Sequence, residues 1–231
     1  IQLNLEDTDA FKALVDNKGF QSNENIKKSP VIEAIKKYPK RIFLAAGAFL
    51  SVQVTFYILI AFMLAYGVTS ANMARDDMLA AVLIASAIMV PIQFVFSSYS
   101  DRHGRKGIFM LGAVLTGIWA FAIFPLVDTG NFYLIVLAIT GGLVFLAMMY
   151  GPQAAFFTEL FSTEVRYSGA TLGYQFGAIV GGAFAPTIAV KLWTEFDIIW
   201  VSAYIALASL LTLISVMALT ETYQSDLNNT D

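Results

Sequence analysis

Long apolar runs, separated by short polar segments, make up the chain beyond about residue 40. There are six of them, and none contains Asp, Glu, Lys, Arg or His. They lie at about residues 42–66, 78–99, 107–127, 132–157, 168–190 and 198–219. Each is close to or above the roughly 20 residues that a helix needs to cross a bilayer. Six successive helices of this kind cannot all occupy the centre of a water-soluble fold, so the pattern predicts an all-α membrane protein with six transmembrane helices.

The first 40 residues are polar and of mixed charge. Ser29-Pro30 is typical of a helix start, because Pro suits the first helical position. The segment VIEAIKKY then predicts a short amphipathic helix, which Pro39 ends. We therefore expect a solvated linker with one surface helix at residues 1–40, a membrane domain at residues 41–220 and a polar tail at residues 221–231.

Composition and charge narrow the possible functions. Hydrophobic residues make up 58% of the chain and charged residues 13%, against about a quarter charged in soluble proteins. The absence of cysteine excludes disulfides and thiolate metal sites, and we predict neither a metal nor a cofactor. The net charge of −3 does not indicate a nucleic-acid partner, so the partner that the pattern predicts is the lipid bilayer.

Basic residues favour one side of the predicted membrane domain. They cluster before the first run, between the second and third runs, and between the fourth and fifth, whereas the other side has only Arg75 and Lys191. Cytoplasmic loops of membrane proteins carry an excess of Lys and Arg. We therefore expect the two ends of the chain and these basic loops to be cytoplasmic.

The stretch from Tyr150 to Pro186 has the most distinctive pattern, because two apolar arms flank a charged hinge at Thr158 to Ser168. In the first arm, Gly151-Pro152 predicts a break in the helix. In the second arm a glycine recurs every fourth residue, at Gly169, Gly173, Gly177 and Gly181. That spacing places the glycines along one helix face, where another backbone can approach closely. A broken helix beside a glycine-faced one indicates a pathway rather than plain anchoring.

The loop after the second run, SSYSDRHGRKG, contains residues whose ion pair would hold the loop in one conformation. Asp101 opens an otherwise basic loop, and Arg105 follows four residues later, at a spacing that permits an ion pair on a helix. The alternative is an ordinary positively charged loop with a glycine turn. A phosphate-binding loop is disfavoured, because Gly104 alone between the basic residues does not build a nest of backbone amides.

These motifs resemble a known family. SDRHGRK is similar to the D-R-x-G-R-[RK] loop of the major facilitator superfamily, and the sequence from Tyr150 to Gly182 resembles its metabolite:proton symporter family, which includes carriers for citrate, 2-oxoglutarate, shikimate and proline or betaine. The resemblance implies that the six runs are helices 7–12, the C-terminal half of a major facilitator fold. We expect the chain, which begins with Ile1, to be a piece of a longer protein whose first six helices are absent.

The same resemblance implies gating residues in the two basic loops. They are Ser97, which replaces the family's usual glycine, with Asp101, Arg102, Gly104, Arg105, Lys106, Glu159, Glu164 and Arg166. We expect Glu159 to pair with Arg166 or with a basic loop. By the pseudo-symmetry of the family, the partner of Asp101 would lie in the missing half. The alternative is a solvated turn with interfacial charge.

Neutral polar side chains within the runs predict a substrate path. The candidates are Gln53, Tyr57, Tyr150, Gln153, Tyr174 and Gln175. For each, the alternative is a plain hydrogen bond between helices. Because the runs hold no acid or base, we expect the proton-coupling carboxylate in the missing half. We also expect the surface against which the glycine strip moves to lie outside this chain.

The sequence thus predicts half of a secondary active transporter, not an enzyme, that moves a small organic acid or zwitterion with H⁺ in a bacterial inner membrane. We predict that the chain alone does not transport. An enzyme is disfavoured because the chain has one histidine, His103, placed in a loop, and no HExxH or GxSxG pattern. A channel-like protein or a non-transporting membrane subunit stays open as an alternative.

Overall fold

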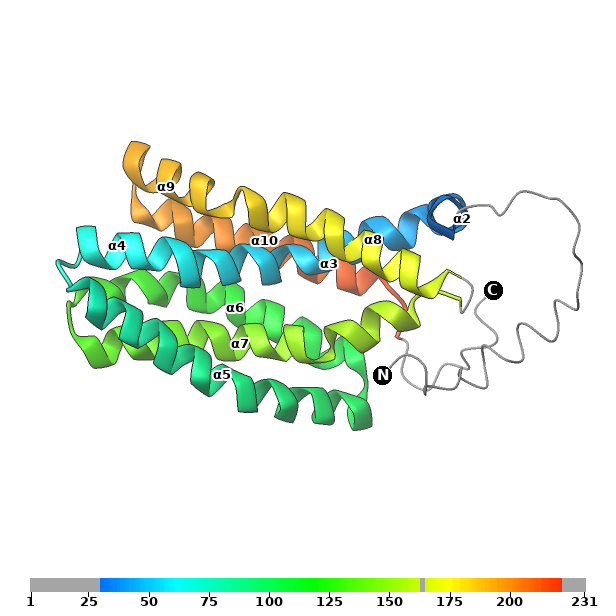
Figure 1. Cartoon of the computed structure of the whole chain (residues 1–231), viewed down its shortest axis with the longest axis horizontal. Helices are drawn as coiled ribbons and strands as arrows, with labels where there is room; N and C mark the ends of the chain where they lie inside the picture. Colours follow the sequence, from blue (N-terminus) through cyan, green and yellow to red (C-terminus); the bar gives the residue numbers. More distant parts are fainter. Residues whose placement is uncertain (1–29, 163–164, 222–231) are drawn as a thin grey trace, which may run out of the picture.

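Six helices long and apolar enough to cross a membrane lie side by side in the computed structural model, which describes residues 30–162 and 165–221 (Figure 1). Within those residues the spans are Pro39–Thr69, Arg75–His103, Arg105–Asp128, Phe132–Glu159, Arg166–Glu195 and Ile198–Ala218. Each contains or nearly contains one of the predicted apolar runs. The predicted all-α membrane fold is therefore confirmed.

Four of the spans are single helices and two are composite. The single helices are α5 (Arg75–His103), α6 (Arg105–Asp128), α7 (Phe132–Glu159) and α10 (Ile198–Ala218). The first span consists of α3 (Pro39–Tyr57), the π-helical segment η2 (Ile58–Phe62) and α4 (Met63–Thr69). The fifth consists of α8 (Arg166–Ala178), the π-helical segment η3 (Ile179–Ala183) and α9 (Ala185–Glu195).

The bundle is built from two groups of three spans. In one group α7 packs against α5 and α6, and in the other α3 packs against α8 and α10. Contacts of α6 with α10 and of α3 with α7 join the groups. Helices α3 and α7 thus occupy the middle of the bundle and position the residues around them.

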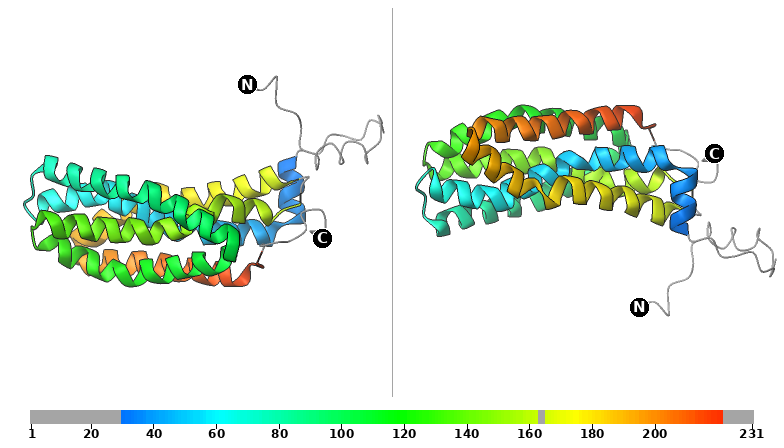
Figure 2. Two further views of the ribbon diagram at one scale, coloured as in Figure 1. Left: turned by 90° about the horizontal axis from the view of Figure 1, so that it is seen from below. Right: turned by 90° about the horizontal axis from the view of Figure 1, so that it is seen from above.

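The two ends of the bundle differ in charge. One end, called the basic end here, carries the turn at Gly104, the α7–α8 loop and the last residues of α10. The short helix α2 (Pro30–Lys37) lies across this end (Figure 2). It begins at Pro30 as predicted, but Pro39 does more than end it, because Pro39 is also the first residue of α3.

The glycine strip of the fifth span packs against α3. A Cβ added to Gly177 would lie 2.7 Å from the carbonyl oxygen of Ala46. One added to Gly181 would lie 3.0 Å from that of Leu50. The first glycine of the strip instead lies beside the ring of Phe161. The predicted close backbone approach is thus confirmed, but our expectation that the facing surface lies outside the chain is wrong, because α3 forms it.

Helix α7 is not broken at Gly151-Pro152, so that prediction is wrong. A proline removes only one donor from the ladder, and membrane helices tolerate the loss. The glycine serves close packing instead, because a Cβ on Gly151 would lie 2.9 Å from the carbonyl oxygen of Gln93 and 3.1 Å from the amide nitrogen of Ser97. At this crossing of α5 and α7, the residue without a side chain is supplied by α7.

The interruptions of regular helix lie in η2 and η3 instead. The amide of Met63 donates to the carbonyl of Ile58, five residues earlier, as in a π-turn. After η3, Phe184 separates the segment from α9, whose first turn contains Pro186. The two segments lie at one level of the bundle, because Gly182 of η3 meets the ring of Tyr57, which directly precedes η2.

Hydroxyl groups join α3 to α10 inside the membrane domain. The amide of Ser51 donates to Oγ1 of Thr212 at 2.9 Å, and that hydroxyl donates to the carbonyl of Gly47 at 2.9 Å. The hydroxyls of Ser51 and Ser209 also lie 2.9 Å apart. These buried contacts satisfy polar groups that lipid cannot satisfy.

Candidate functional site

The turn between α5 and α6 places a cluster of charges at the basic end. Helix α5 ends at His103, and Gly104 follows with a φ of 102°, a conformation that glycine adopts readily and other residues rarely do. The chain then enters α6 at Arg105. This turn returns the guanidinium of Arg105 toward the end of α5 and toward α7.

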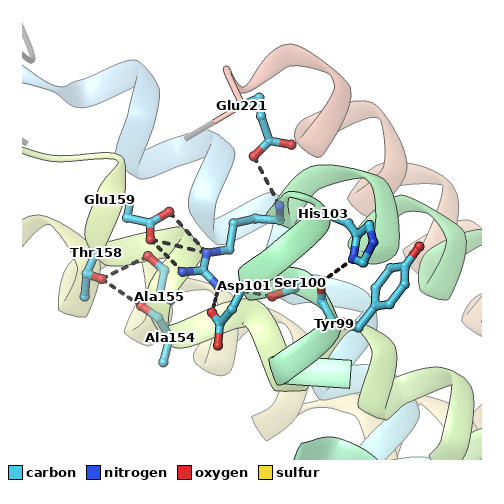
Figure 3. A network of polar contacts seen from close by, with 10 residues as sticks. Tyr99, Ser100, Asp101, His103, Ala154, Ala155, Thr158, Glu159 and Glu221 are labelled. Atoms are coloured by element: carbon cyan, nitrogen blue, oxygen red, sulfur yellow. Dashed lines mark hydrogen bonds and ion pairs between the residues drawn. The ribbon is translucent and has the colours of Figure 1, made fainter. Parts of the chain in front are cut away.

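Arg105 is the centre of that cluster, and Figure 3 shows its partners Ser100, Asp101 and Glu159 from close by. Its Nη2 lies 2.9 Å from Oε1 of Glu159, and its Nε donates to the same carboxylate at 3.2 Å. Its Nη1 donates to the hydroxyl of Ser100 at 3.1 Å and forms an ion pair with Asp101. Arg105 and Glu159 are 12% and 19% exposed, whereas Asp101 is 55% exposed. The two-nitrogen contact with Glu159, on α7, is therefore the better shielded of the two ion pairs.

A second set of contacts ties the end of α10 to the start of α6. The carboxylate of Glu221 accepts from the amides of Arg105 at 3.2 Å and Lys106 at 3.1 Å. An anion at a helix N-terminus is stabilised by the unpaired amides there. In the other direction, Nζ of Lys106 donates to the carbonyls of Met217 at 2.9 Å and Leu219 at 2.7 Å. Each helix end thus caps the other.

The other predicted gating residues are less closely involved. Arg102 lies exposed near the end of α5, and Nε of Arg166 donates to the carbonyl of Phe161 at 3.4 Å. Glu164 lies outside the described residues. Of the partners predicted for Glu159, the basic loop supplies Arg105. We predicted His103 in a loop, but it is the last residue of α5. Its ring stacks on that of Tyr99, with the ring centroids 4.3 Å apart (Figure 3).

A hollow of about 360 Å³ lies beside this cluster, between α5, α7 and α8. Its polar lining includes three of the predicted path residues, Tyr150, Gln153 and Tyr174, together with Gln93 and Tyr167. Gln153 is only 4% exposed, and its Oε1 has no hydrogen-bond partner among the described residues. A buried amide oxygen without a donor is unfavourable, so a solute or a water in the hollow would stabilise it.

The remaining path candidates do not line this hollow. Gln53 and Tyr57 face η3, where a Cβ on Gly182 would meet the Tyr57 ring at 2.7 Å and Nε2 of Gln53 at 3.2 Å. Gln175 is exposed and does not line the hollow, although it follows Tyr174 directly on α8. Of the six candidates, Tyr150, Gln153 and Tyr174 therefore line the hollow together, Gln53 and Tyr57 lie beside η3, and Gln175 belongs to neither group.

Sequence reasoning missed several polar residues of this region. Gln93 lies inside the second apolar run and could have been found by the criterion that selected Gln53. Ser100 accepts from Arg105, only five residues further along the chain, and was overlooked. Glu221 offered no signal, because its contact with the start of α6 depends on how distant helix ends meet.

A hydrogen bond between Tyr66 and Asp128, at the opposite end of the bundle, was also not predicted. The hydroxyl of Tyr66, which is 1% exposed, donates to Oδ1 of Asp128 at 2.6 Å. The ring of Tyr66 lies 5.3 Å from that of Phe124 and 5.2 Å from that of Trp193. This contact fastens α4 to the end of α6 and to α9.

Comparisons with known proteins give the family. The family model described as the Major Facilitator Superfamily matches residues 8–172, more than half of the chain. The inner membrane metabolite transport protein YhjE of Escherichia coli K12 is 30% identical over 94% of this chain, and the shikimate transporter of the same organism is 31% identical over 78%. A proline/betaine transporter of Escherichia coli K12 is 28% identical over 87%.

These relatives are considerably longer than the chain. The matches cover 54% of YhjE, 42% of the shikimate transporter and 40% of the proline/betaine transporter, so the chain spans about half the length of the curated relatives it matches. The relatives are named as transport proteins rather than enzymes. With six membrane-spanning helices and a family match over most of its length, the chain belongs to the Major Facilitator Superfamily.

Proposed function

We propose that this chain forms the C-terminal half of a secondary active transporter that moves a small metabolite by alternating access. The observation that carries the proposal is the hollow of about 360 Å³, lined by neutral polar side chains and placed beside the ion-pair cluster of the basic end. Carriers of this type bind substrate between two halves that rock against each other. The names of the relatives favour a small carboxylate, such as shikimate, or a zwitterion, such as proline or betaine.

The face that carries the hollow is suited to a second half. Tyr150 and Tyr174 are 38% and 37% exposed, and Tyr167 is 84% exposed. Exposed tyrosines can contact an apolar neighbour while their hydroxyls bind a polar solute. A missing six-helix half would cover this face and enclose the hollow, so we propose that half as the main partner.

The ion-pair cluster acts in this proposal as part of the gate. Arg105 and Glu159 hold the basic ends of α6 and α7 together, so that these ends move as a unit. Asp101 is more exposed and can form an additional contact with the other half when the basic end closes. The proton-coupling carboxylate belongs to the other half, and the basic end faces the cytoplasm of a bacterium whose inner membrane holds the carrier.

Uptake by the full-length protein tests the function. The protein is reconstituted in liposomes, and uptake of labelled shikimate, citrate, proline and betaine is measured with and without an inward proton gradient. Saturable accumulation of one of them, driven by the gradient, is expected. Ionic conductance without accumulation would contradict the proposal and favour a channel, and the absence of both would favour a non-transporting subunit.

Two glutamines provide a matched test of the hollow. Gln153→Leu removes the buried amide that lines it, and Gln175→Leu removes an exposed amide on the neighbouring helix. We expect Gln153→Leu to raise KM at least tenfold, about the effect of a lost hydrogen bond in a buried site, whereas Gln175→Leu leaves KM unchanged. Equal KM values for the two variants would exclude Gln153 from the substrate path.

The gating role of Asp101 is tested separately. Asp101→Asn keeps the side-chain shape but removes the charge, so transport should slow while substrate binding, measured by isothermal titration, persists. Asp76→Asn, an exposed acid at the opposite end, is the control. Normal transport by the Asp101 variant would dispose of its gating role.

A further inference from the structure

A second recess, of about 540 Å³, lies on the other side of α8 from the hollow. Phe176 lines this groove and Tyr174 lines the hollow. Residues two positions apart on an α-helix point in roughly opposite directions, about 200° apart. The groove therefore faces away from the surface that we assign to the other half, and in a membrane it faces lipid.

The groove exists because α8 and α10 each pack along α3 but hardly touch each other. The strip of α3 between them has small residues at its floor, Ala46 and Gly47, and Gly177 adds no side chain from α8. Phe176 and Val180 form one wall and are 50% and 62% exposed. The result is an apolar groove on the surface of the bundle.

The length of the groove matches one leaflet of a bilayer. Its lining on α3 runs from Pro39, at the basic end, to Leu50. At about 1.5 Å per residue this stretch is about 16 Å long. The hydrocarbon core of a bilayer is roughly 30 Å thick, so half of it is close to this length. An acyl chain that enters at the basic end would follow the groove to about the middle of the membrane.

Two exposed lysines adjoin, in sequence, residues at the mouth of the groove. Ile35 and Pro39 line the mouth, and each is followed directly by an exposed lysine, Lys36 and Lys40. Neither lysine makes an ion pair within the described part of the chain. Helix α2, which carries Lys36, lies across the end of the bundle and exposes Ile32, as an amphipathic helix at a membrane surface does (Figure 2).

We propose that this groove binds an anionic phospholipid of the leaflet at the basic end. One acyl chain lies in the groove, over the small residues of α3, and the phosphate lies between Lys36 and Lys40. Here a recess and a pair of cations are combined, so the site selects for charge.

The first test measures that selectivity in the full-length protein. A photoactivatable phosphatidylglycerol, with the reactive group in one acyl chain, is cross-linked to the protein in phosphatidylcholine nanodiscs, and the labelled peptides are mapped. Labels should concentrate on α3 and on the adjoining part of the fifth span. Unlabelled phosphatidylglycerol should compete and phosphatidylcholine should not. Equal competition by both lipids, or labels spread evenly over all spans, would overturn the proposal.

Substitutions then separate the headgroup from the acyl chain. Basic residues at a membrane surface contribute roughly fivefold each to the binding of anionic lipid, so Lys36→Gln with Lys40→Gln should weaken competition by phosphatidylglycerol roughly 30-fold. Lys191→Gln, an exposed lysine at the opposite end, should have no effect. Unchanged competition in the double variant would refute the headgroup site.

A bulky side chain tests the groove itself. Val180→Trp should fill it and abolish labelling of α3, because Val180 is exposed and can be enlarged without disturbing the core. Leu207→Trp, on an exposed part of α10 that does not line the groove, is the control. Unaltered labelling in Val180→Trp, or cross-links that join two copies of the protein through this face, would overturn the proposal.

Discussion

Replacing Gly177 with alanine should force α8 away from α3. The new Cβ would lie 2.7 Å from the carbonyl oxygen of Ala46 and 2.8 Å from Cβ of Phe49, whereas ordinary contacts begin at 3.4 Å. The two helices must therefore separate by several tenths of an ångström. Neither neighbour yields easily, because one is backbone and Phe49 is fully buried. Overpacking of this kind lowers the free energy of unfolding by about 1–3 kcal/mol.

A second glycine separates this effect from helix propensity. Gly107, also in a helix, would have nothing within 4 Å of an added Cβ, so Gly107→Ala gains the preference of alanine for helix, about 1 kcal/mol, without a clash. Gly177→Ala has the same gain and adds the clash, so the difference between the two variants measures the packing at the α3–α8 contact.

Thermal unfolding in detergent, followed by tryptophan fluorescence, is the measurement. For a protein of this size about 1 kcal/mol corresponds to roughly 2–4 °C in Tm, so Gly177→Ala should unfold roughly 2–12 °C below Gly107→Ala. Equal Tm values, or a higher one for Gly177→Ala, would refute the inference that the glycine strip is packed against α3.

Three further substitutions test single contacts, each by unfolding in detergent. Arg105→Lys keeps the charge, but a lysine cannot contact both carboxylate oxygens of Glu159 as Arg105 does. The free energy of unfolding should fall by about 1.5–3 kcal/mol, and an unchanged value would show that the ion pair contributes nothing. Tyr66→Phe removes the donor to the exposed carboxylate of Asp128 and should cost about 0.5–1.5 kcal/mol; an unchanged stability would contradict this. Thr212→Val removes two hydrogen bonds to α3. Hydrogen bonds between membrane helices average about 0.6 kcal/mol, so the free energy of unfolding should fall by only about 1 kcal/mol. A fall several times larger would count against this expectation.

The spans were predictable from the apolar runs, but their ends were not. The second run ends near residue 99, whereas α5 continues through Asp101 to His103. Charged residues at a membrane surface can still extend a helix, and here the helix ends only where Gly104 adopts a positive φ. Apolarity marks the membrane, and backbone conformation marks the end of the helix.

The contacts of the charge cluster were less predictable the farther apart their residues lie along the chain. The spacing of Asp101 and Arg105 alone indicated their ion pair. For Glu159 the sequence left two possible partners, Arg166 and a basic loop. The contact of Glu221 with the start of α6 could not be predicted, because it joins segments 116 residues apart and follows from how α10 packs beside α6.

The interruption of the first span could not be predicted from the sequence pattern. The residues Ile58–Phe62 are as apolar as those on either side, and nothing in their composition distinguishes a π-turn from an α-turn. Gly151-Pro152, in contrast, has the composition of a helix break and lies in an unbroken helix. Packing against neighbouring spans, rather than local propensity, determines where these helices depart from regular geometry.

The π-helical segments also change how side chains must be assigned to faces. A π-turn accommodates one residue more than an α-turn, and one residue corresponds to about 100° of rotation. Positions on the two sides of η2, or of η3, are therefore out of phase by about that angle. A periodicity of four that begins at Gly169 describes α8 correctly, but the same counting carried into α9 would point to the wrong side of the span. Alanine or cysteine scans of these two spans need a separate helical wheel for each part, and a change of phase at this level would be visible in their accessibility profiles.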